Sequence, residues 1–169
     1  MITSQSLDTP LWAFSLAVYD RAGVADECLD LQERLGLDVD ILLFAAFVGA
    51  VASVRLEVSD IAAANAEVAS WQADIVRSLR QVRRALKPLS AEGLRAQVKA
   101  AELEAEKIEL AMLWQWSRRQ LNGWPRTDRN RALAANLRAT LEFYGVAAGN
   151  ADAAVAVPRL LEAAARSSY

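Results

Sequence analysis

Acidic side chains occur in two groups whose spacing could support metal chemistry. Residues 26–30 place carboxylates one helical turn apart, as in the acidic motif with which isoprenoid-diphosphate enzymes hold magnesium. That chemistry needs a second acidic helix and a large cavity, whereas negative charge near a helix start is favourable by itself. Glu102, Glu106 and Glu109 share one helical face, but dimetal bundles combine such glutamates with histidine. A solvated face, or pairing with Arg77, explains them more simply, so we predict no metal site and no cofactor.

The chain contains no histidine and a single cysteine, Cys28. Histidine is the commonest general base and transition-metal ligand, so Ser-His-Asp and Cys-His sites are excluded within this chain. One thiolate cannot build a Cys/His zinc site. Cys28 lies in an apolar helical stripe and is interpreted as a small core hydrophobe. We predict no catalytic residues, and a non-enzymatic role is favoured over an enzymatic one.

Basic side chains form the strongest functional pattern. Five of them follow a spacing of three and four along one predicted helix: Arg77, Arg80, Arg83, Arg84 and Lys87. The charge is also split along the chain, because residues 1–74 hold 12 acidic against 3 basic side chains and residues 75–169 hold 16 basic against 9 acidic. Charge of this kind influences partners rather than fold. The leading hypothesis is therefore an interaction protein whose arginine-bearing helix faces bind an acidic protein partner.

Other uses of the basic residues remain open. The acidic half of the chain can dock on the basic half and neutralise it internally. Cations near a helix C-terminus also complement the helix dipole, and arginine stems cover apolar surface. Arginine beside aromatic residues suits nucleic-acid contacts, although no recognised nucleic-acid module is present. Residues 110–116 are apolar on several faces, which indicates either core or a patch for self-association into a homo-oligomer.

A second functional hypothesis places a small-molecule site between the N-terminal helices. Its pocket would be built from Trp12, Tyr19, Asp38 and Asp40, which combine aromatic surface with carboxylates. Such a pocket would suit either a binding protein or an enzyme. The sequence does not identify the ligand.

The elements that must position these residues are helices. Apolar residues recur at spacings of three and four, and alternating strand patterns are missing. We predict one all-α domain over residues 1–169, a bundle of about six to seven helices around a buried third helix near residues 41–49. Two long apolar stripes, at 71–86 and 94–112, flank a short turn and predict a long antiparallel helical hairpin. Residues 147–169 are expected as a loosely packed C-terminal extension.

Composition also bears on location. The longest uncharged apolar run, residues 41–54, is shorter than the roughly 18 residues of a membrane span and includes a glycine. The first residues lack the basic and apolar regions of a signal peptide. One cysteine cannot form an internal disulfide. We therefore expect a cytoplasmic protein.

Short segments in the first two thirds of the chain form a distinctive pattern. They are residues 11–19 (LWAFSLAVY), 23–24, 28–32, 36–39 and 42–44, with weaker stretches at 71–87 and 102–110. Over roughly residues 11–115 the pattern resembles a bacterial family of small helical conserved hypothetical proteins with a domain of unknown function. The resemblance implies an all-α domain and no reaction. The chain departs from the family pattern at Leu35, Asp40 and Phe47, where the family often has histidine, asparagine and tryptophan.

Overall fold

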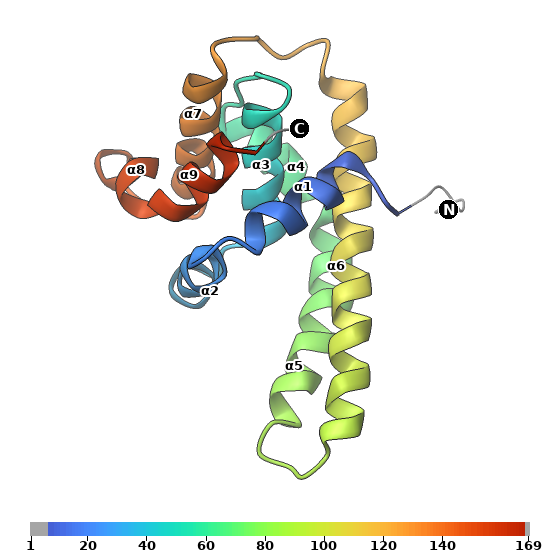
Figure 1. The fold of residues 1–169 in the computed structure, drawn as a ribbon. Coiled ribbons are helices and arrows are strands. Elements are labelled where there is room, and N and C mark those ends of the chain that lie inside the picture. Colours follow the sequence, from blue (N-terminus) through green and yellow to red (C-terminus); the bar gives the residue numbers. More distant parts are fainter. Residues whose placement is uncertain (1–6, 168–169) are drawn as a thin grey trace.

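The computed structural model describes residues 7–167, which form helices joined by short loops (Figure 1). In chain order the elements are α1 (Pro10–Tyr19), α2 (Val24–Leu35), α3 (Val39–Ala50), α4 (Val58–Trp71), a π-helical turn (Gln72–Val76), α5 (Arg77–Ala85), α6 (Glu92–Gln120), α7 (Arg129–Phe143), a 3-10 turn (Ala148–Asn150), α8 (Ala153–Ala156) and α9 (Pro158–Ala165). Between residues 7 and 167 there is no strand, and one isolated bridge joins Val54 to Arg126. The predicted all-α fold is confirmed.

Helix α3 is the centre of the fold, with the other helices arranged around it (Figure 1). Asp38 begins it by accepting a hydrogen bond from the backbone N–H of Asp40, at 3.0 Å. The run from Ile41 to Ala50 is apolar on all sides and entirely buried. Helix α7 packs most closely against it. The predicted central helix is therefore present.

The predicted hairpin is also present. Helix α4, the π-helical turn and α5 form one continuous rod that runs antiparallel to α6, and the far end of the pair projects from the body as an arm (Figure 1). Where the rod lies against the body, the Trp71 indole N–H donates to the Ala105 carbonyl at 3.0 Å. Helix α5 has no buried residue, so the arm is solvated on most sides.

The C-terminal stretch corrects an expectation. Residues 147–167 are not a loose extension, because α8 and α9 pack against α7, α2, α3 and α1. Val157, Leu160 and Ala164 are fully buried. Two short helices therefore pack against the core. With α4 to α5 counted as one, residues 7–167 contain eight α-helices. Residues 168–169, and residues 1–6 on which the signal-peptide expectation depends, lie outside the described residues.

In residues 7–167, no helix combines the length and the apolar character that a membrane crossing requires.

Candidate ligand pocket and carboxylate cluster

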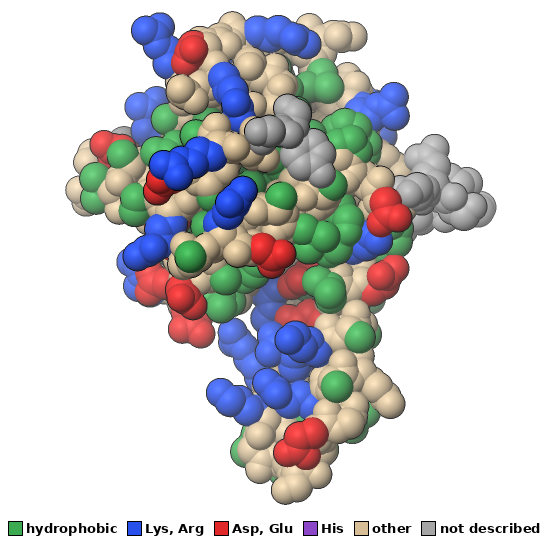
Figure 2. All heavy atoms as spheres, viewed as in Figure 1, with side chains coloured by type: hydrophobic (Ala, Val, Ile, Leu, Met, Phe, Trp, Pro, Cys, Tyr) green, Lys and Arg blue, Asp and Glu red, His purple; other side chains and the backbone are tan. Residues whose placement is uncertain are grey.

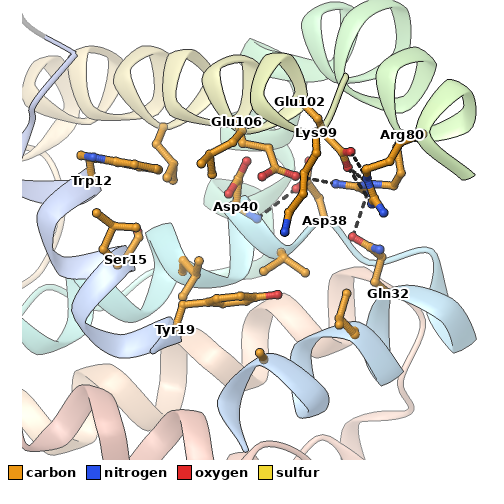
Figure 3. Close-up of a pocket in the computed structure, with 18 of the residues that line it drawn as sticks. Trp12, Ser15, Tyr19, Gln32, Asp38, Asp40, Arg80, Lys99, Glu102 and Glu106 are labelled. Atoms are coloured by element: carbon orange, nitrogen blue, oxygen red, sulfur yellow. Dashed lines mark hydrogen bonds and ion pairs between the residues drawn. The ribbon is translucent and has the colours of Figure 1, made fainter. Parts of the chain in front are cut away.

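A cavity of about 470 Å³ opens between the body and the base of the arm. Its walls come from α1, α2, the start of α3, α5 and α6 (Figure 3). The four residues that the sequence suggested for a pocket, Trp12, Tyr19, Asp38 and Asp40, all line this one cavity. The chain brings them together because α1 packs against α3, and both aspartates stand at the start of α3.

One end of the cavity is aromatic and apolar. Trp12 and Ser15 lie there, and Tyr19 extends along the floor (Figure 3). Burial, followed by the nearby Cys28 and Glu106, raises the pKa of the Tyr19 phenol to about 12, so it remains a neutral donor. The Ser15 hydroxyl oxygen is buried without a hydrogen-bond partner in residues 7–167. This end therefore offers stacking surface and two polar hydroxyl groups.

The other end is held by an ion-pair network centred on Arg80. Its guanidinium donates to Glu102 Oε1 at 3.0 Å, to Glu106 Oε1 at 2.8 Å and to Gln32 Oε1 at 2.8 Å (Figure 3). Arg83 also pairs with Glu102. Burial alone would raise the pKa of Glu102, but the hydrogen bonds from Arg83 and Arg80 outweigh it and lower that pKa. The network joins α5 to α6 and to α2.

This network divides the five basic residues that the sequence placed in one partner-binding set. Arg80 and Arg83 are engaged internally, with Glu102 and Glu106 rather than the glutamate–Arg77 pairing expected from the sequence. Arg77, Arg84 and Lys87 are exposed, and none of these three has an ion pair within residues 7–167. Two of the five basic residues are therefore paired inside the fold, and three remain exposed.

Lysine and arginine side chains gather where the arm leaves the body (Figure 2). Arg84 and Lys99 line the cavity and have no carboxylate partner in the described part of the chain. The sequence placed Lys99 in a basic region over residues 77–99, but not among the five partner-binding residues or the four pocket residues. Lys99 lies one helical turn before Glu102 in α6. The sequence shows this spacing, but it does not show that Lys99 shares a cavity with residues of α5.

Three carboxylates converge in the wall of the cavity, where Asp38 and Asp40 line it. One oxygen from each of Asp38, Asp40 and Glu109 lies within 4.8 Å of the others. Glu109 is fully buried, and neither of its carboxylate oxygens has a hydrogen-bond donor among residues 7–167. The Asp38 carboxylate beside it can bond to Glu109 only if one of the two acids is protonated.

The electrostatics of this cluster are unfavourable to full ionisation. Burial, then the charges of Asp38 and Asp40, raise the pKa of Glu109 to about 11. Burial and the charge of Asp38 also raise the pKa of Asp40 well above its usual range. The folded protein thus binds protons at these acids more tightly than the unfolded chain does. This proton binding stabilises the folded state fully when the pH is below the ordinary carboxyl pKa, and the stabilisation is lost as the pH rises.

The structure separates the glutamates that the sequence grouped on one face. Glu102 and Glu106 turn toward Arg80, whereas Glu109 turns toward α3. Two acids of the group at residues 26–30 have structural contacts. Glu27 accepts the backbone N–H groups of Arg159 and Leu160 at the start of α9, at 3.2 and 2.9 Å. Asp30 pairs with Arg34 at 2.7 Å. Cys28 is buried in the core, and burial raises its thiol pKa to about 12.

The model of a protein family described as protein of unknown function (DUF2390) matches residues 10–113. The chain belongs to this family. The matched segment begins with α1 and ends within α6, so it includes every element that lines the cavity and all three carboxylates of the cluster. The resemblance seen in the sequence is confirmed. No curated protein and no solved structure matches the chain.

Proposed function

We propose that this member of the DUF2390 family binds a small amphipathic organic anion in the cavity at the base of the arm. The observation that carries the proposal is a cavity wall that combines the aromatic side chains of Trp12 and Tyr19 (Figure 3) with two cations, Arg84 and Lys99. Neither cation has an ion pair within residues 7–167. Ligand sites are typically apolar concavities with a few convergent polar groups. The volume of about 470 Å³ suits a molecule of one or two rings.

The rim of the cavity supports the same interpretation. Leu16, Leu29 and Leu103 line the cavity, yet their side chains remain 42%, 44% and 51% exposed. Grouped exposed apolar residues commonly mark a surface that a partner covers. Deeper in, the Ser15 hydroxyl oxygen is buried without a partner within residues 7–167, and a polar ligand atom there would satisfy it. The carboxylates of Glu102 and Glu106 are occupied by Arg80, so they do not neutralise Arg84 and Lys99.

An aromatic sulfonate dye, 8-anilinonaphthalene-1-sulfonate, tests this proposal because it combines rings with one anionic group. We expect the protein to bind about one dye molecule with enhanced fluorescence, and Arg84→Gln combined with Lys99→Gln to weaken binding about tenfold, equivalent to about 1.4 kcal/mol. Ala25→Phe, which adds a ring to the cavity wall, should abolish that binding. Calorimetric titration of the protein with the dye gives the affinity and the stoichiometry. A metal chelator is present, so that dye binding is measured without bound metal ions.

The matched control is Arg118→Gln combined with Arg126→Gln, which removes two exposed cations that do not line this cavity. It should bind the dye as the unmodified protein does. Equal binding by all of these variants would contradict the proposal, because the dye would then lie elsewhere, for example on the exposed leucines of the arm.

The acidic-partner hypothesis is a second candidate, favoured by the shape of the arm. The arm projects from the body and carries Arg77 and Lys87 outside the cavity, together with Val82, which is 48% exposed, and Leu89, which is 57% exposed. Cations beside exposed apolar side chains suit an acidic amphipathic partner.

Arg77→Gln combined with Lys87→Gln is expected to reduce the capture of an acidic protein from host lysate by more than about fivefold, because steering charge is lost while the cavity stays intact. Quantitative mass spectrometry of the captured proteins measures the loss. Capture unchanged relative to the control that combines Arg118→Gln with Arg126→Gln would rule out this use of the arm.

A further inference from the structure

Asp38, Asp40 and Glu109 form a group that neither proposed function uses. We propose that these three carboxylates bind one divalent cation of the hard, oxygen-seeking class, such as Mg²⁺, Ca²⁺ or Mn²⁺. This inference concerns a site in the wall of the cavity and does not require an organic ligand. It differs from the dimetal arrangement considered from the sequence, because Glu102 and Glu106 take no part in it.

The geometry suits such an ion. One oxygen from each acid lies within 4.8 Å of the other two. Oxygen ligands stand about 2.0–2.6 Å from Mg²⁺ or Ca²⁺, so oxygens on opposite sides of one ion are about 4–5 Å apart. Carboxylate oxygens are the preferred donors of these ions, and the group contains no nitrogen or sulfur donor that would favour zinc or copper.

The backbone already holds two of the donors in place. Gly36, with φ of 64°, ends α2 in the left-handed conformation, and Asp38 then caps α3. The cap bond from the Asp40 N–H to Asp38 Oδ1 uses one carboxylate oxygen and fixes the orientation of the side chain. Asp38 and Asp40 therefore present their carboxylates on a rigid helix start, which is a favourable support for a metal site.

Glu109 is the observation that points to a ligand. Its side chain is fully buried and is directed at the two aspartates, yet both of its oxygens lack a donor in residues 7–167. A buried carboxylate in this state is costly unless it is paired with a cation or protonated. The nearby guanidinium of Arg80 is committed to Glu102 and Glu106, and none of the three acids has an ion pair with a residue of the described segment 7–167.

Two occupants can neutralise this cluster, namely protons or a metal ion. The raised pKa values of Asp40 and Glu109 describe the cluster without a metal, in which bound protons reduce the negative charge. A divalent cation supplies two positive charges to a group that can release its protons, and it satisfies all three acids at once. Asp38 and Asp40 line the cavity, so an ion can reach the cluster from that side and keep water ligands facing the cavity.

Binding of Mn²⁺, followed by electron paramagnetic resonance on the full chain near neutral pH, tests the proposal. We expect one Mn²⁺ per chain, displaced by excess Mg²⁺ or Ca²⁺, with a dissociation constant below about 1 mM. Glu109→Gln keeps the shape of the side chain but removes its charge, and it should weaken Mn²⁺ binding at least about tenfold. Glu104→Gln, an exposed glutamate on the same helix, is the matched control and should bind Mn²⁺ normally.

The fold of the variant is checked separately. In the absence of metal, Glu109→Gln should raise Tm, because it removes a buried acid that resists ionisation, so loss of Mn²⁺ binding cannot be ascribed to unfolding. A protein that leaves the free Mn²⁺ signal unchanged holds protons only, and this result overturns the inference. Equal Mn²⁺ binding by Glu109→Gln and the unmodified chain overturns it as well. Dye binding is measured with a chelator present, so either proposal can fail while the other stands.

Discussion

Asn136→Ala is expected to lower the free energy of unfolding by about 3–5 kcal/mol, one of the two largest effects anticipated for this chain. Asn136 is fully buried in α7. Its amide donates to the carbonyls of Ala45 and Val54, at 3.1 and 2.9 Å, and its oxygen accepts the Leu56 N–H at 2.7 Å. Alanine would leave three buried backbone groups without this partner, each costing about 1–3 kcal/mol.

The bonds to Val54 and Leu56 hold the loop between α3 and α4 against α7, and the bond to Ala45 joins α7 to α3. The loop adopts irregular backbone, including Ser53 with φ of 55°, and cannot satisfy its own polar groups as a helix does. Urea unfolding followed by circular dichroism measures the loss. Asn130→Ala, an exposed position in the same helix, should change stability by less than about 0.5 kcal/mol. A loss below about 1 kcal/mol for Asn136→Ala would show that the loop does not depend on this side chain.

Gly49→Ala is expected to cost about 3 kcal/mol or more, because it forces apart the two most closely packed helices. A Cβ atom at Gly49 would lie 2.5 Å from Leu133 Cα and 2.7 Å from Leu133 N. The obstructing atoms are backbone, so no side-chain rotation relieves the contact and α3 or α7 must move. The thermal unfolding midpoint should fall by about 2–4 °C for each kcal/mol lost.

Gly93→Ala is the matched control, with an effect of opposite sign. Gly93 also lies within a helix, but no atom stands within 4 Å of its Cβ position and its backbone φ is not positive. Alanine there should stabilise the protein by about 0.5–1 kcal/mol. If Gly49→Ala and Gly93→Ala shift Tm equally, the close approach of α3 and α7 does not limit stability.

Local pattern predicted much of this architecture. The buried third helix follows from an uninterrupted apolar run, and the hairpin follows from two stripes around a proline-containing turn. Gly49 lies within this apolar run, and the structure shows the backbone of Leu133 packed against it. The C-terminal stretch was predicted incorrectly because its alanines carry little local signal, and only their packing against the core shows their role.

The candidate site could likewise be predicted only in part from the sequence. Trp12, Tyr19, Asp38 and Asp40 lie on neighbouring elements of the chain, so their shared cavity could be anticipated from the sequence. Glu109 was grouped with Glu102 and Glu106 because one helical face was all that spacing could indicate. Which of these acids meets arginine and which meets aspartate depends on contacts with α5 and α3.

By itself, the sequence determined that this chain is helical, where its principal helices run and that it contains no histidine, because residue type and periodicity act over a few neighbouring positions. Only the tertiary structure decided that Arg80 and Arg83 are neutralised, that Arg84 and Lys99 face a cavity, and that Glu109 meets two aspartates. Burial and the pairing of charges come from residues distant in the chain, so the ionisation and the free charge of each side chain depend on the fold.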